Sequence, residues 1–181
     1  LGTIYKKGKF KGKHTGTIGD IGCISFNANK IITSGGGGMI LTKQKKIAEK
    51  TLYITTQSKD DPIKYIHDSI GYNLRLTNVH AAIGLAQLEK INKVINKKKI
   101  INNFYKKRIG MIDNFEILES PKYADNNYWF NILKIKSFKN KENIDSIVSK
   151  LNQLKIQVRP IWHLNHKQKF LKKFQTYNIK K

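Results

Sequence analysis

Acidic residues, arginine and cysteine are scarce in this sequence. Its 181 residues include 12 Asp and Glu against 35 Lys and Arg, and the formal net charge is +23. The single cysteine, Cys23, excludes an intramolecular disulfide, and its place in an alternating apolar stretch predicts a small buried side chain. No apolar run approaches membrane-spanning length and no secretory leader is visible, so we expect no membrane partner and a cytoplasmic location.

The excess of positive charge suggests a nucleic-acid partner, and the best candidate segment is residues 6–13, K-K-G-K-F-K-G-K. Three features weaken this interpretation. Lysines are spread over the whole chain, no nucleic-acid-binding motif is present, and arginine, whose fork suits phosphate, occurs only at Arg75, Arg108 and Arg159. A basic nucleic-acid-binding module that uses this loop is therefore kept as the alternative hypothesis, and we expect no specific nucleic-acid partner.

A lysine at the end of an apolar strand is the most informative local feature. Residues 22–38 read G-C-I-S-F-N-A-N-K-I-I-T-S-G-G-G-G, so Lys30 lies between a strand and four glycines. A lysine amine reacts with an aldehyde cofactor only when it is neutral, a state that burial or a nearby cation favours. The Ser25 hydroxyl and free backbone N–H groups can hold a phosphate. Taken alone, the pattern favours a solvated lysine beside a flexible turn.

Two further segments change this balance. Residues 71–88 read G-Y-N-L-R-L-T-N-V-H-A-A-I-G-L-A-Q-L, and residues 158–166 read V-R-P-I-W-H-L-N-H. Together with the Lys30 segment, and in this order and spacing, they resemble the sugar aminotransferases of the DegT family, in the branch that acts on UDP-linked 4-keto-6-deoxy amino sugars. The resemblance runs over essentially the whole chain.

The resemblance implies an α/β fold. Residues 1–88 would form the C-terminal half of the large, cofactor-binding domain of a fold-type I pyridoxal-phosphate enzyme, with a parallel sheet that begins around Ile21. Residues 89–181 would form an incomplete α+β small domain. We therefore expect a fragment that lacks the N-terminal half, including an aspartate before Leu1 that pairs with the cofactor's pyridine nitrogen, and the extreme C-terminus. Such a fragment would be inactive alone.

The implied activity is transfer of an amino group from glutamate to the C4 ketone of a nucleotide-linked 4-keto-6-deoxy sugar, with UDP as the expected nucleotide, in bacterial surface-polysaccharide biosynthesis. The implied cofactor is pyridoxal 5'-phosphate, bound covalently by Lys30 as the catalytic residue. Ser25 and Asn73 would bind its phosphate, with Asn73 reaching across a homodimer to the partner's site.

The third segment supplies further expected site residues. Arg159, Trp162 and His163 are expected to contact the donor carboxylate or the sugar nucleotide. His163 and His166 are three residues apart, but no third ligand lies near them in the sequence, so we expect no metal site.

Periodicity of the apolar residues predicts the secondary structure. We expect helices over residues 44–56, from Thr77 or Asn78 to about Arg108 without a break, and over 143–154. Besides the strand before Lys30, strands are expected over residues 39–42, 115–118, 128–135 and 156–158.

Overall fold

The computed structural model describes residues 1–137, 144–176 and 179, and these separate into two compact units, Leu1–Lys134 and Ile135–Lys181. The expected boundary between a large and a small domain at residue 88 stays a prediction, because it refers to the domains of a longer enzyme.

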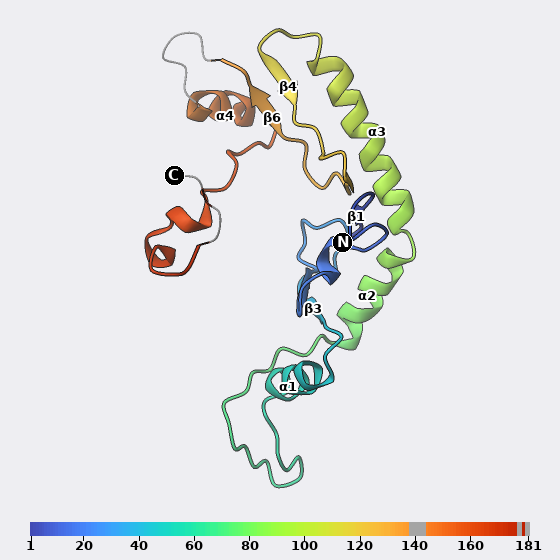
Figure 1. Cartoon of the computed structure of the whole chain (residues 1–181), viewed down its shortest axis with the longest axis vertical. Coiled ribbons are helices and arrows are strands. Elements are labelled where there is room, and N and C mark those ends of the chain that lie inside the picture. Colours follow the sequence, from blue (N-terminus) through green and yellow to red (C-terminus); the bar gives the residue numbers. More distant parts are fainter. Residues whose placement is uncertain (138–143, 177–178, 180–181) are drawn as a thin grey trace. The chain divides into compact units, whose positions relative to one another are not determined.

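A two-stranded hairpin carries the Lys30 segment at its tip (Figure 1). Strand β2 (Gly22–Ser25) pairs with β3 (Gly38–Leu41), and Gly22 lies opposite Leu41 while Ser25 lies opposite Gly38. The pairing is antiparallel, so these two strands do not form the expected parallel sheet. The 12-residue connection holds no helix that could carry the chain across the sheet to a parallel start, and it returns beside β2 instead.

The hydrophobic core of the first unit lies directly beside Lys30. Phe26, Ile31 and Ile32 are its buried members, with exposed fractions of 8, 8 and 3%. The partly buried residues packed against them are Leu1, Ile24, Ile91, Val94, Ile95 and Trp129. Full burial of one such side chain contributes about 1.5–3 kcal/mol, so the two isoleucines after Lys30 hold its backbone firmly.

The long helix expected from residue 78 to 108 is two helices, α2 (Asn78–Leu88) and α3 (Ile91–Ile109). Thr77 caps α2 as expected, since its side chain accepts a hydrogen bond from His80 N. The break has a tertiary cause. In α2, the Gln87 side chain accepts a hydrogen bond from Thr33 N at 2.9 Å, whereas the first turns of α3 pack on the core. A turn at residues 89–90 lets both helices make these contacts.

Short strand pairs hold the rest of the first unit together. Strand β1 (Ile4–Tyr5) pairs antiparallel with β5 (Ala124–Asp125), although about 120 residues separate them along the chain. Strand β4 (Phe115–Ile117) pairs with β6 (Leu133–Ile135), and the unit boundary falls within β6. The 3-10 helix η1 (Thr15–Thr17) lies against β2.

The strand expected over residues 128–135 forms only over the last three of them. Tyr128 has φ of 52°, a left-handed conformation that interrupts an extended chain. Residues 126–132 therefore form an irregular segment, and it carries Trp129 toward the core.

Helix α1 (Lys45–Thr55) follows β3, as expected, and a long connection then leads to Thr77. Within this connection, the backbone at residues 57–58 packs closely against the backbone at Gly71. Gln57 and Ser58 have positive φ angles of 74° and 49°, and a methyl group added at Gly71 would lie 2.3 Å from the carbonyl carbon of Gln57. Only glycine fits this crossing.

The second unit contains α4 (Ile144–Gln153) and two 3-10 helices, η2 (Asn165–Lys167) and η3 (Lys169–Leu171). The helix expected over 143–154 is confirmed, apart from residue 143, which lies outside the described residues. The strand expected over 156–158 is wrong. The Asn152 side chain binds both the N–H and the carbonyl of Val158, so an amide side chain occupies the groups that a neighbouring strand would use.

Two surface properties complete the fold. Cys23 is exposed, contrary to expectation, because in β2 it alternates with Ile24, and Ile24 is the residue that packs against the core. No helix among the described residues is both long enough and apolar enough to cross a membrane.

Candidate functional site

A tight turn fixes the backbone at Lys30. Lys30 N donates to Asn27 O at 3.0 Å, and the Asn27 side chain accepts a hydrogen bond from Ala28 N at 2.8 Å. The buried Ile31 and Ile32 follow at once. Lys30 is half-buried, which distinguishes it from the solvated lysine that the local pattern favours.

The Lys30 amine lies over an aromatic ring from a distant part of the chain. Its Nζ is 3.8 Å from the centroid of the Trp129 indole. The indole N–H donates to the carbonyl of Asn29, the residue before Lys30, so the ring is attached to the same turn that it covers. Stacking on Phe130, with ring centroids 3.9 Å apart, extends the aromatic surface.

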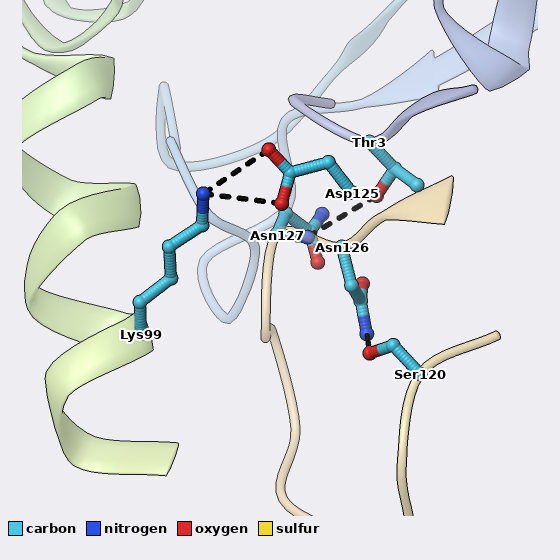
Figure 2. Close-up of polar contacts among 6 residues, drawn as sticks. All are labelled: Thr3, Lys99, Ser120, Asp125, Asn126 and Asn127. Atoms are coloured by element: carbon cyan, nitrogen blue, oxygen red, sulfur yellow. Dashed lines mark hydrogen bonds and ion pairs between the residues drawn. The ribbon is translucent and has the colours of Figure 1, made fainter. Parts of the chain in front are cut away.

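The residues before Trp129 are anchored on three sides (Figure 2). Lys99 of α3 binds both carboxylate oxygens of Asp125 at 3.1 Å. Asn126 donates to the Ser120 hydroxyl at 3.1 Å, and Asn127 N donates to the Thr3 hydroxyl at 3.3 Å.

Asn127 also connects Trp129 with the start of the chain. Its side chain accepts a hydrogen bond from Trp129 N at 3.0 Å and donates one to Leu1 O at 2.7 Å. These two hydrogen bonds hold Leu1 beside the segment that carries Trp129.

Ser25 ends β2, and its exposed hydroxyl accepts a hydrogen bond from Asn27 N at 3.3 Å. Its O–H proton remains available to a phosphate oxygen. Two glycines after Lys30 have a structural reason of their own. Gly37 has φ of 81°, and a methyl group at Gly38 would lie 2.6 Å from Ile24 O across the hairpin.

Asn73 lies in a different part of the first unit. It forms a bridge with Thr56 and lines a hollow of about 500 Å³. The lining residues are Leu52, Thr56, Gln57, Lys59, Asn73 and Arg75. Lys59 and Arg75 make this hollow attractive to an anion. Among the described residues, no hydrogen bond joins Asn73 to Lys30 or Ser25.

The remaining expected site residues belong to the second unit. Arg159, Trp162 and His163 are all exposed and lie in one irregular segment before η2. Within the described residues, no group of three or more His, Cys, Asp or Glu side chains could hold a metal ion.

The basic loop at residues 6–13 is folded around aromatic rings. Phe10 lies 5.7 Å from the Tyr5 ring, and the Nζ atoms of Lys9 and Lys13 are 5.7 and 6.0 Å from the centroid of Phe10. Two of the loop's lysines are thus engaged within the chain itself.

The contact of Trp129 with Lys30 was not foreseen from the sequence. The two residues are 99 positions apart, and a tryptophan in a polar segment carries no local signal of its distant neighbour. The predicted roles of Lys30, Ser25, Asn73, Arg159, Trp162 and His163 stay predictions.

Comparison with known proteins finds relatives that match this chain over nearly its whole length. The model of the DegT/DnrJ/EryC1/StrS aminotransferase family matches residues 5–180. GDP-perosamine synthase of Escherichia coli O157:H7 is 36% identical over 173 residues, which cover 94% of this chain and 46% of that protein. EpsN of Bacillus subtilis (strain 168), a candidate pyridoxal phosphate-dependent aminotransferase, is 36% identical over 170 residues, covering 93% of this chain and 41% of EpsN.

Solved structures agree on the fold. The aminotransferase TlmJ from Streptoalloteichus hindustanus superposes with a TM-score of 0.80 at 19% identity, over 93% of this chain and 44% of TlmJ. E. coli GDP-4-keto-6-deoxy-D-mannose-3-dehydratase, solved with bound hydrated PLP, gives 0.74 at 21% identity, over 96% of this chain and 46% of the enzyme. The expected partial α/β fold is therefore confirmed, and the chain spans less than half the length of these proteins. None of them is named as a nucleic-acid-binding protein, so the alternative hypothesis gains no support.

Proposed function

Because the chain belongs to the DegT/DnrJ/EryC1/StrS aminotransferase family, we propose that it is part of a pyridoxal-phosphate-dependent sugar aminotransferase with Lys30 as its cofactor-binding lysine. One observation carries the proposal. Lys30 is half-buried at a fixed turn, flanked by a buried core, and its amine is held over the Trp129 ring.

The residues around Lys30 fit the cofactor. Ser25, five residues earlier, offers a hydroxyl for a phosphate oxygen.

Pyridoxal phosphate, when bound, supplies an electron sink that stabilises negative charge at the carbon from which a proton is removed. The protein's part is to hold and move that proton. Lys30 Nζ would first bind the cofactor covalently, then be released by the incoming donor amine, and then act as the base that carries the proton from donor to cofactor carbon. The buried backbone at Ile31 and Ile32 keeps this amine within reach throughout.

The substrates follow from the family and from the relatives' names. We propose glutamate as donor and the C4 ketone of a nucleotide-linked 4-keto-6-deoxy sugar as acceptor, in polysaccharide biosynthesis. A GDP-sugar is named in the relatives at 36% identity, and a UDP-sugar in a Campylobacter jejuni transaminase at 30% identity over 135 residues. We propose UDP, with GDP as the comparison in the assay. Arg159, Trp162 and His163, all exposed, are the residues that would contact these substrates.

We further propose that the enzyme is a homodimer with shared sites and acts in the cytoplasm. The supporting observation is that Asn73 lines a hollow with Lys59 and Arg75, and shares no hydrogen bond with Lys30 among the described residues. An amide beside two cations suits a phosphate, and in a dimer that phosphate would belong to the partner's cofactor.

The test of the proposal is labelling of Lys30. The protein that contains this chain is incubated with pyridoxal phosphate, reduced with borohydride and digested, and the modified lysine is identified by mass spectrometry. The phosphopyridoxyl group should be on Lys30, and Lys30→Ala should abolish both the label and amino transfer from glutamate to UDP- and GDP-linked 4-keto-6-deoxy sugars. Transfer that survives in Lys30→Ala would overturn the proposal.

A further inference from the structure

Trp129 has been assigned no role in the reaction so far, yet its ring makes the most specific contact of the Lys30 side chain. The Nζ to ring-centroid distance of 3.8 Å is well inside the range of a cation–π interaction, and it is shorter than the other lysine–aromatic contacts of the described residues, which measure 4.7–6.0 Å. Both residues are half-buried, so part of this contact is shielded from water. The cation–π attraction holds the ammonium, and ring contact with N–H···π bonding also holds the neutral amine.

The ring is fixed independently of the lysine. Its N–H donates to Asn29 O, its backbone N–H donates to the Asn127 side chain, and its apolar surface packs on the buried core. The position of the indole ring relative to the turn that carries Lys30 is therefore fixed.

A lysine side chain has four rotatable bonds, and immobilising it costs conformational entropy. A turn and two buried isoleucines fix only the backbone of Lys30. The side chain needs a second support, and the indole supplies it by holding the amine end. This removes most rotamers before any cofactor arrives.

We propose that Trp129 is a positioning residue for Lys30: its indole face holds the lysine side chain in place while the ammonium gives its proton to solvent. The neutral amine then adds to the carbon of the cofactor aldehyde, and the aldehyde oxygen leaves as water. The inference rests on the proposed function, since it takes Lys30 as the cofactor-binding lysine. It requires that the aromatic face, rather than bulk alone, determines how selectively Lys30 reacts among the many lysines of the chain.

Two substitutions at Trp129 separate the contribution of the aromatic face from that of apolar bulk. Trp129→Phe keeps an aromatic face but loses the N–H that binds Asn29, whereas Trp129→Leu loses the face and keeps apolar bulk. Phe10→Leu is the matched control, because it removes the ring beneath Lys9 and Lys13 at a distance from the site. Each protein is treated briefly with limiting pyridoxal phosphate, reduced with borohydride, and analysed for the fraction of label on Lys30 relative to all other lysines.

We expect Trp129→Leu to lower the share of label on Lys30 by about two- to fivefold, because the side chain loses the ring contact that also holds its neutral amine. Trp129→Phe should restore most of it, and Phe10→Leu should leave it unchanged. Equal selectivity in Trp129→Leu and the parent protein would overturn the inference and leave the proposed function standing. Absence of label from Lys30 in every protein, the parent included, would overturn the proposed function itself.

A second measurement needs no variant at Trp129. In the protein with ¹³C-labelled lysine, the ε-methylene signal of Lys30, assigned by its absence from Lys30→Arg, should be shifted upfield by the ring current of the indole. An unshifted signal would overturn the inference even if Trp129→Leu does not fold.

Discussion

Gly71→Ala is the substitution for which the structure gives the clearest expected effect. A Cβ atom at this position would lie 2.3 Å from the carbonyl carbon of Gln57, 2.4 Å from Ser58 N and 2.6 Å from the Ser58 hydroxyl. The first two are backbone atoms, so the clash cannot be relieved by a rotamer change. The chain at residues 57–58 must move away from residue 71.

The magnitude follows from two opposing terms. Inserting a methyl group into a close contact costs about 1–3 kcal/mol, while replacing glycine by alanine reduces the entropy of the unfolded chain and returns about 0.4–1 kcal/mol. We expect a net loss of stability of about 1–2 kcal/mol. Gly36→Ala is the control, because no atom lies within 4 Å of its Cβ position and its φ is outside the left-handed region. It should be neutral or slightly stabilising.

Amide hydrogen exchange can show whether the loss of stability in Gly71→Ala comes from the chain around residue 71. Gln57 N donates to Tyr72 O, Tyr72 N to Ile54 O, and Leu74 N to Thr55 O, at 2.7–3.1 Å. In Gly71→Ala these amides should exchange faster, while the amide of Lys30 should be unaffected. A lower urea midpoint with unchanged exchange at Tyr72 and Leu74, or equal midpoints for the two alanine variants, would refute this account of the crossing.

Two further predictions concern pH and assembly. Burial lowers the pKa of His14, whose ring nitrogens face Gly2 N and Gly16 N at 3.0 Å. The unfolded chain therefore takes up a proton that the folded one resists, and urea midpoints should fall as the pH drops below about 6.5, less so in His14→Gln. In the protein that contains this chain, mixing inactive Lys30→Ala and Asn73→Asp subunits should restore part of the transferase activity, because one site of each mixed dimer carries neither change. If subunits exchange and no activity returns, Asn73 does not act across the dimer.

Sequence patterns predicted the elements that depend on local chemistry. The strand at β3, the helix α1 and the Thr77 cap all follow from periodicity or from a side chain that reaches its own backbone. The family resemblance, confirmed by the family model over residues 5–180, predicted the partial α/β fold.

The elements that the sequence did not predict depend on distant partners. The helix breaks after Leu88 because Gln87 binds Thr33 while α3 packs on the core, and neither contact is visible in the periodicity. The expected strand at residues 156–158 is absent because Asn152 takes up the backbone groups of Val158. Trp129 reaches Lys30 for a similar reason, since the pairing of β1 with β5 carries the segment there.

The hydrogen bond from the Trp129 indole to Asn29 spans 100 positions of the sequence, and this separation sets when the site can exist. During synthesis, the turn at Lys30 emerges from the ribosome long before its aromatic support. Closing a loop of that length costs entropy that only the finished core and the β1–β5 pairing repay. A nascent chain that stops short of residue 129 therefore carries the lysine without its support, and the support is among the last parts of the first unit to be made.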